Sequence, residues 1–187
     1  MNYKMMGKFI SQILFVEAAF MLPALLLSIF YGEQSAVRGF IGAIIITLIV
    51  AAIMYVLCRN AVKRFYAREG LVCVGMSWIA LSIMGCLPFF ISREIPDFLD
   101  ALFEIVSGFT TTGSSILTDV EALSHGLLYW RSFSHWLGGM GVLVFLLAVV
   151  TRDRGGSGFT MHILRAESPG PNVGKLVPKM HTTARIL

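Results

Sequence analysis

The chain has 187 residues, of which 56% are hydrophobic and 14% are charged, and its formal net charge is +4 at pH 7. Soluble domains carry about 25% charged residues, so this composition argues against an ordinary soluble globule and against a disordered chain. The basic residues stand in short blocks between long apolar runs, which indicates a membrane protein rather than a nucleic-acid-binding one. Cys58, Cys73 and Cys86 have no metal-ligand spacing and are interpreted as small buried hydrophobic residues.

Four apolar runs are long enough to cross a bilayer as helices, because a hydrocarbon core about 30 Å thick needs about 20 helical residues. The runs are residues 9–31, 39–58, 70–92 and 132–151. A backbone in contact with lipid must satisfy its own hydrogen bonds, so all four are predicted to be helices. The predicted fold class is an all-α membrane protein that crosses the bilayer several times.

The positions of lysine and arginine predict the orientation of these helices. With the N-terminus in the cytoplasm, every basic residue except Arg38, Arg93 and Arg131 lies on the inner side. Because the cytoplasmic flanks of membrane helices are enriched in basic residues, both ends of the chain are predicted to be cytoplasmic.

Glu17 lies in the middle of the first run, where an ionised carboxylate costs about 2.5–3.5 kcal/mol on insertion scales. We expect Glu17 to be either neutral or paired inside the helix bundle, with Gln12 or with a neighbouring helix. A structural role is favoured over a role in ion passage, because the first two helices are expected to form a peripheral hairpin.

The outer segment 93–131 contains a predicted helix that is too short to cross the membrane. Pro96 and Asp97 are typical of a helix start, and Gly108 is a plausible stop. Four apolar residues recur at the spacing of one helix face, and these are Phe98, Leu102, Ile105 and Phe109. A helix of about a dozen residues suits a re-entrant half-helix.

Six small residues follow this short helix, and five of them carry hydroxyl groups: Thr110, Thr111, Thr112, Gly113, Ser114 and Ser115. Non-helical backbone at membrane depth persists only where it is buried in protein or lines water. The C-terminal end of the short helix would direct about half a negative charge at this stretch. Carbonyl oxygens of extended backbone can replace the hydration shell of a monovalent cation, which suggests a cation filter. A Ser/Thr-rich outer loop is the alternative.

Several motifs resemble the Trk/Ktr/HKT potassium-transporter superfamily, and most of all its bacterial TrkH/TrkG branch of translocation subunits. They are DALFE at 100–104, SGFTTTG at 107–113, WLGGMG at 136–141 and the tail segment 159–179. Two helices precede the helix–pore loop–helix unit, as in the TrkH/TrkG branch. The resemblance therefore runs through nearly the whole chain.

The resemblance implies a pore made of four related helix–pore loop–helix units on one chain, each with a filter strand around a signature glycine. That glycine is Gly113 here. The main-chain carbonyls of Thr111, Thr112, Gly113 and Ser114 are implied to be the potassium ligands.

The implied organisation has three parts. Residues 1–62 form an N-terminal transmembrane hairpin, residues 63–152 form the first pore unit, and residues 153–187 form a cytoplasmic linker that leads to a second unit. With one filter strand of four, the chain is expected to be an N-terminal fragment.

The function implied by the resemblance is potassium uptake across the bacterial inner membrane, driven by the membrane potential. Potassium is the transported ion, and neither a cofactor nor an enzymatic activity is expected. The implied partners are a cytoplasmic nucleotide-binding gating subunit of the TrkA kind and, at full length, a second copy of the protein.

Two other classes of function stay open from the residues alone. One is an intramembrane serine hydrolase that pairs Ser114 or Ser115 with His135, although neither an oxyanion site nor an orienting acid accompanies these residues in the sequence. The other is a membrane scaffold that conducts no ion.

The outer side is predicted to be acidic, through Glu33, Glu94, Asp97, Asp100, Glu104, Asp119 and Glu121. Such a rim would concentrate cations near the pore, and a solvated face explains any single member equally well. Arg131 and His135 are expected to bond to the loop that follows the short helix. Direct contact with potassium is not expected, because both side chains can be cationic and would repel it. Gly138, Gly139 and Gly141 are interpreted as packing positions, with a hinge as the alternative.

Overall fold

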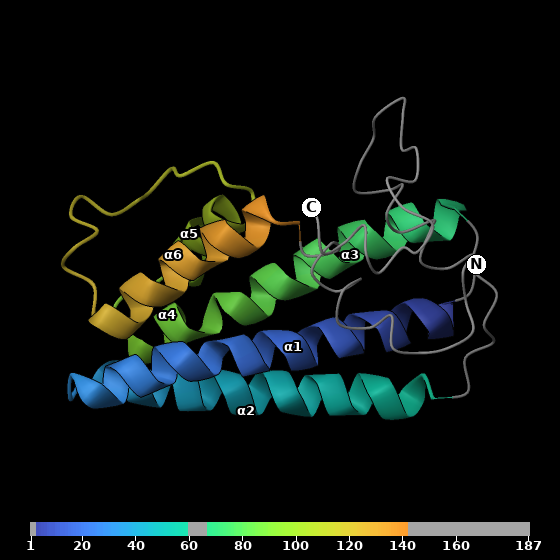
Figure 1. The fold of residues 1–187 in the computed structure, drawn as a ribbon, viewed down its shortest axis with the longest axis horizontal. Helices are drawn as coiled ribbons and strands as arrows, with labels where there is room; N and C mark the ends of the chain where they lie inside the picture. The colour runs from blue at the N-terminus through green and yellow to red at the C-terminus, as the bar shows by residue number, and fades with distance from the viewer. Residues whose placement is uncertain (1–2, 60–66, 142–187) are drawn as a thin grey trace, which may run out of the picture.

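The structure is a computed structural model that describes residues 3–59 and 67–141. Within these residues the regular secondary structure consists of helices (Figure 1). The helices are α1 (Tyr3–Phe30), α2 (Gln34–Leu57), α3 (Ala67–Gly85), α4 (Leu87–Ser92), α5 (Phe98–Phe109) and α6 (His125–Gly139). The predicted all-α fold class is confirmed.

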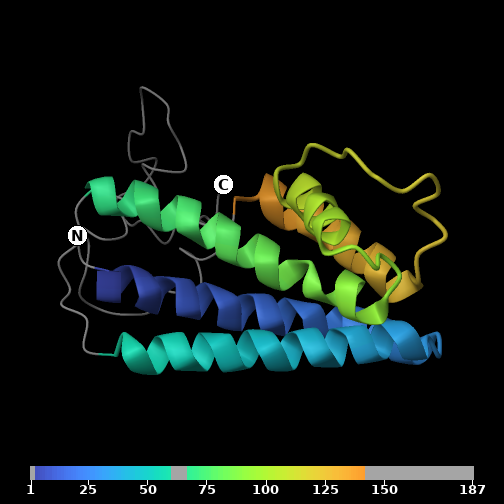
Figure 2. The same ribbon diagram turned by 180° about the vertical axis from the view of Figure 1, so that it is seen from behind.

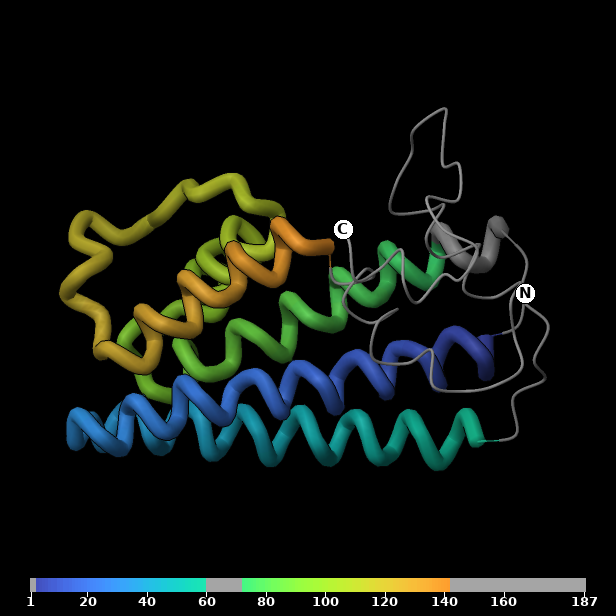
Figure 3. Tube along the Cα trace, viewed as in Figure 1, coloured from blue at the N-terminus to red at the C-terminus, as the bar shows by residue number. Residues whose placement is uncertain are grey.

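The two longest helices, α1 and α2, form an antiparallel hairpin, and α3 runs alongside α1 (Figures 1 and 3). Viewed from behind, α5 and α6 lie together at the end of the molecule that contains the α1–α2 turn (Figure 2). Three spans in the described part are long and apolar enough to cross a membrane: Tyr3–Phe30, Gln34–Leu57 and Val72–Ser92. They contain the cores of the first three predicted runs.

The outer face of α2 is apolar and exposed. Ile45, Ile49 and Ile53 recur every four residues and are each more than half exposed. An exposed apolar stripe along a whole helix is unfavourable in water and favourable in contact with lipid. The hairpin therefore has the surface of a membrane-embedded pair.

The third predicted run is two helices rather than one. α3 ends at Gly85, Cys86 intervenes, and α4 starts at Leu87. Pro88 explains the break, because proline lacks an N–H donor and its ring clashes with the carbonyl four residues earlier. In the first turn of α4 this missing donor has no consequence.

The predicted bounds of the fourth run, 132–151, are wrong within the described residues. α6 begins earlier, at His125, and ends at Gly139. Gly141 then takes a φ of 66°, and its N–H donates back to the helix, which is a left-handed helix termination. Hydropathy places the start too late because the first turns of α6 contain His125 and Arg131, which bond to Glu33 and Glu104. Residues from 142 onward lie outside the described part.

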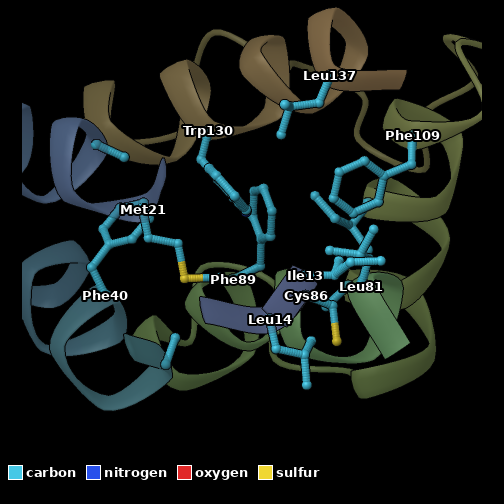
Figure 4. Close-up of a cluster of buried hydrophobic side chains, with 14 of the residues drawn as sticks. Ile13, Leu14, Met21, Phe40, Leu81, Cys86, Phe89, Phe109, Trp130 and Leu137 are labelled. Atoms are coloured by element: carbon cyan, nitrogen blue, oxygen red, sulfur yellow. The ribbon is translucent and has the colours of Figure 1, made fainter. Parts of the chain in front are cut away.

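The hydrophobic core of the described residues receives side chains from α1 to α6. Figure 4 shows Met21, Phe89 and Trp130 pointing into one cluster from three different helices. Trp130 is completely buried, and its indole N–H donates to the main-chain carbonyl of Gly85 at 2.9 Å. The hairpin and the short helices that follow it therefore share one core.

Close packing of α2 against α4 depends on Gly39. A Cβ at this position would stand 2.7 Å from the Pro88 carbonyl oxygen and 3.0 Å from the Ser92 Cβ atom. The first contact is with backbone, which cannot rotate away as a side chain can. The two helices thus approach as closely as they do because position 39 has no side chain.

We expect Gly39→Ala to lower the free energy of unfolding by about 1–3 kcal/mol, the usual range for overpacking. Gly75→Ala is the matched control, because a Cβ on Gly75 of α3 meets no atom within 4 Å. The control should be neutral or stabilising, since alanine is the better helix former. Unfolding in detergent measures both, and equal stability of the two variants would contradict the packing argument.

Candidate functional site

The short helix α5 spans Phe98–Phe109, so it starts after Asp97 as expected and continues one residue beyond Gly108, the expected stop. The Asp97 carboxylate begins it by accepting the N–H of Leu99 at 2.8 Å and that of Asp100 at 3.3 Å. The predicted apolar face is partly confirmed. Ile105 and Phe109 are buried and Leu102 is half-buried, but Phe98 is exposed.

The chain unwinds directly after Phe109. Thr110 is the C-cap, and the alternate residues Thr111 and Gly113 have φ values of 56° and 75°. A positive φ is unusual for a β-branched residue such as threonine, so the surrounding structure must hold Thr111 in place. The segment from Thr110 to Ile116 is exposed. The prediction of non-helical backbone at this point is confirmed.

Ser107, in the last turn of α5, holds three successive residues of the unwound segment. Its carbonyl accepts the N–H of Thr112 at 3.0 Å and that of Gly113 at 3.4 Å. Its hydroxyl donates to the carbonyl of Ser114 at 2.6 Å. One residue of the short helix therefore sets the path of the segment that follows it.

Within the described part of the chain, the main-chain carbonyls of residues 110–113 differ from the N–H groups of this segment in having no partner. Among the described residues none of these oxygens accepts a hydrogen bond, whereas the N–H groups of Thr111, Thr112 and Gly113 are bound to α5. The carbonyl of Ser114 already has Ser107 as a partner, but a carbonyl oxygen has two lone pairs and keeps one available. The segment thus presents exposed, unsatisfied acceptors on a fixed backbone.

Glu104 anchors the next two residues of the loop. Its Oε1 atom accepts the hydroxyl of Ser115 at 2.7 Å, and its Oε2 atom accepts the N–H of Ile116 at 3.2 Å. Oε1 also accepts Nε of Arg131, on α6, at 2.7 Å. A single buried carboxylate thus joins α5, the loop and α6.

The prediction that Glu104 belongs to a solvated acidic rim is wrong. Its side chain is 0% exposed, and Arg131 opposite it is 14% exposed. Glu104 and Ser107 are three residues apart and so share one face of α5. The sequence analysis did not predict that Glu104 and Ser107 bond to the loop. The signal that could have indicated it is the spacing of these two polar residues, which places them on one face of a mostly apolar helix.

Among the described residues, neither Arg131 nor His135 bonds directly to the loop, so this prediction is wrong: Arg131 reaches the loop only through Glu104 of α5. The His135 Nδ1 atom lies 2.9 Å from the carbonyl oxygen of Arg131, one turn earlier on α6. The Ser115 hydroxyl is occupied by Glu104. Among the described residues, no hydrogen bond joins His135 to Ser114 or Ser115, so the serine–histidine dyad of the hydrolase alternative is not assembled.

Gly138 has the packing role expected of the glycine cluster. A Cβ on Gly138 would collide with the carbonyl group and Cα of Phe109, at the end of α5. α6 thus lies directly on the backbone from which the unwound segment departs. Gly141 instead ends α6, so the three glycines do not share one role.

Glu33 fastens the α1–α2 turn to the start of α6. Its carboxylate accepts the N–H of His125 at 2.8 Å, the N–H of Gly126 at 3.3 Å and Nδ1 of His125 at 2.7 Å. Tyr31 stacks on the His125 ring with centroids 3.9 Å apart. Burial alone would raise the pKa of Glu33, but these hydrogen bonds outweigh it and leave the pKa below its ordinary value.

Glu94 ties down the far end of the loop. Its Oε2 atom accepts the N–H of Ser124 at 2.8 Å, and its Oε1 atom accepts the hydroxyl of Ser35 at 3.4 Å. The segment between α5 and α6, which arches over one end of the molecule in Figure 1, is thus fixed at its two ends. Of the predicted acidic rim, Asp97, Asp100, Asp119 and Glu121 are exposed.

Comparison with known proteins identifies the family. The family model TrkH, described as a cation transport protein, matches residues 37–187. The chain belongs to the TrkH family. This confirms the resemblance carried by the sequence motifs.

Curated relatives match along the whole chain. The Trk system potassium uptake protein TrkH of Halomonas elongata is 33% identical over 100% of this chain and 38% of the relative. The protein TrkG of Escherichia coli K12 is 35% identical over 89% of this chain and 34% of the relative. The chain thus spans less than two fifths of the length of these relatives.

A solved structure has the same fold. The crystal structure of the potassium transporter TrkH from Vibrio parahaemolyticus matches with a TM-score of 0.76 and 26% identity. The match covers 100% of this chain and 36% of that protein. The helical arrangement described above is therefore that of a TrkH-type membrane protein.

Glu104→Gln should destabilise the protein by about 3–5 kcal/mol, because it leaves the Arg131 guanidinium without its carboxylate in a largely buried position. Asp100→Asn, one turn earlier on α5 and exposed, is the control and should be nearly neutral. Denaturant unfolding in detergent measures both. If the two variants are equally stable, Glu104 is not the anchor described here.

The Glu33 contacts predict a specific dependence on pH. Because the pKa of Glu33 is lowered in the folded state, its stabilisation is present above the ordinary glutamate range and is lost as the pH falls through the lowered pKa. Glu33→Gln should remove this acid-side slope from the unfolding midpoint, whereas Glu121→Gln in the exposed loop should retain it. An unchanged slope in Glu33→Gln would show that the Glu33 contacts do not form.

Proposed function

We propose that this chain contributes one wall of a potassium-selective pathway across the bacterial inner membrane. In it, the main-chain carbonyls of Thr111, Thr112, Gly113 and Ser114 bind the dehydrated ion. The single observation that carries the proposal is the unwound, exposed backbone after α5 with free carbonyls at 110–113. Such oxygens replace the water shell of a monovalent cation.

Helix α5 supports cation binding electrostatically. Its C-terminus lies at Phe109, so its macrodipole directs about half a negative charge towards the adjoining segment. The nearest buried cation, the guanidinium of Arg131, is neutralised by Glu104. The field at the carbonyls therefore favours a cation and not an anion.

One strand cannot surround an ion. The exposure of residues 110–116 fits a surface that other filter strands complete, and the longer relatives have room for further units. We accordingly expect four related strands to form the complete site and this chain to show no selective flux as a monomer.

The proposed topology places both ends of the chain in the cytoplasm, because Lys4, Lys8 and Arg59 lie at one end of the hairpin. The membrane potential then drives potassium inward past the loop. By resemblance to its family, the full-length protein would form a homodimer and bind a cytoplasmic nucleotide-binding gating subunit of the TrkA kind.

Gly113→Ser, made in the complete natural protein that carries this sequence, should abolish growth of a potassium-uptake-deficient strain at low potassium. A Cβ on Gly113 meets no atom within 4 Å, so the substitution acts through the backbone. A left-handed conformation costs a residue with a side chain about 1–2 kcal/mol, which favours a conformation that turns the carbonyls away.

Gly32→Ser is the matched control for this experiment. Gly32, in the α1–α2 turn, has a φ of 73° and equally open surroundings, so its backbone strain is the same. The control should preserve growth at low potassium. Normal growth of Gly113→Ser, or equal loss in both variants with comparable membrane levels, would refute the assignment of the loop as the filter.

A further inference from the structure

A second buried glutamate, Glu17, lies in the middle of α1. Unlike Glu104, which pairs with Arg131, it has no basic partner among the described residues. Its side chain is 2% exposed. Neither carboxyl oxygen has a hydrogen-bond partner among the residues that the structure describes, so the expected alternative of pairing with Gln12 is wrong. A buried carboxyl group without a partner is a rare feature that calls for an explanation.

The carboxyl group of Glu17 lies at the contact between α1, α3 and α5. A Cβ on Gly85 of α3 would stand 3.0 Å from Glu17 Oε1, and the same point is 3.1 Å from Ile105 Cγ1 and 3.2 Å from Phe109 Cε2. Phe109, labelled in Figure 4, and Ile105 both belong to the buried hydrophobic core. Glu17 thus lies beside the last turn of α5, from which the unwound segment departs.

The helices packed around Glu17 offer it no cation within residues 3–59 and 67–141. From the α3–α4 junction it is faced by the thiol of Cys86. The titratable groups on α5 and α6 are engaged elsewhere: Glu104 pairs with Arg131, and the His135 ring contacts the carbonyl of Arg131. In addition, the negative end of the α5 dipole disfavours a second negative charge nearby. Burial without a compensating partner disfavours the ionised form of this carboxyl group.

We propose that Glu17 is a proton-binding site, occupied at neutral pH, whose release of the proton displaces the last turn of α5. A carboxylate at this position is stable only if water or a cation reaches it, which requires α1 to move away from Gly85 and Phe109. Because Phe109 is the last residue of α5 and the unwound segment follows it directly, proton release would displace that segment. The effect on uptake rests on the function proposed above, whereas the proton site does not.

Infrared spectroscopy of this chain, reconstituted in lipid, tests the proton site directly. At neutral pH we expect a carboxylic-acid C=O band that shifts in D₂O and is lost in Glu17→Gln. Glu121→Gln, which alters an exposed glutamate, should retain the band. Absence of this band from the unsubstituted chain, or its persistence in Glu17→Gln, would overturn the proposal. The measurement on the unsubstituted chain holds even if the variant folds poorly.

The displacement of α5 is tested by the pH profile of potassium uptake in the complete natural protein. Uptake should fall on the alkaline side, and Glu17→Gln, which mimics the protonated form, should lose this fall. An unchanged profile in Glu17→Gln would overturn the link between Glu17 and the pore segment. These experiments distinguish the two proposals. If the filter assignment is wrong but the proton site exists, Gly113→Ser grows normally and the infrared band is still present.

Discussion

The buried carboxylate of Glu104 is the constraint on which the geometry of this protein depends. A loop that leaves a short helix at membrane depth must satisfy its backbone from protein or from a water-lined space, because lipid offers no hydrogen-bond partner. Glu104 meets this need from within α5, and Arg131 supplies the positive charge that makes a buried carboxylate tolerable. Removing either partner would leave an uncompensated charge beside the loop.

The same solution recurs at the end of the molecule that carries the α1–α2 turn. Glu33 accepts N–H groups at the start of α6, and Glu94 accepts the N–H of Ser124 just before it. Glutamate is suited to this task because its two oxygens reach donors from segments distant in sequence. Of the seven acidic residues predicted to form a cation-attracting rim, three instead form hydrogen bonds between separate segments: Glu33, Glu94 and Glu104.

Much of the fold was predictable because a membrane imposes a minimum length on apolar helices. The first three runs and α5, with Asp97 as its cap, follow from length, periodicity and capping chemistry. α6 was predictable only in part, since Arg131 and His125 appear unfit for a helix in an apolar bundle until their partners are known. Those partners, Glu104 and Glu33, are distant in sequence, and a hydropathy pattern carries no information on distant pairs.

The unwound segment combines two properties that rarely occur together. Its side chains are exposed, yet its backbone is fixed by Ser107 and Glu104, with Thr111 held at a φ of 56°. The left-handed Thr111 directly follows the C-cap of α5, and the N–H groups of Thr111 and Thr112 close the helix end on Gly108 and Ser107, as in a common helix termination. Structure that fixes the main chain while leaving its carbonyls without partners favours a function of the carbonyls themselves. This is the physical reason why the proposed potassium ligand is the backbone rather than the hydroxyl groups.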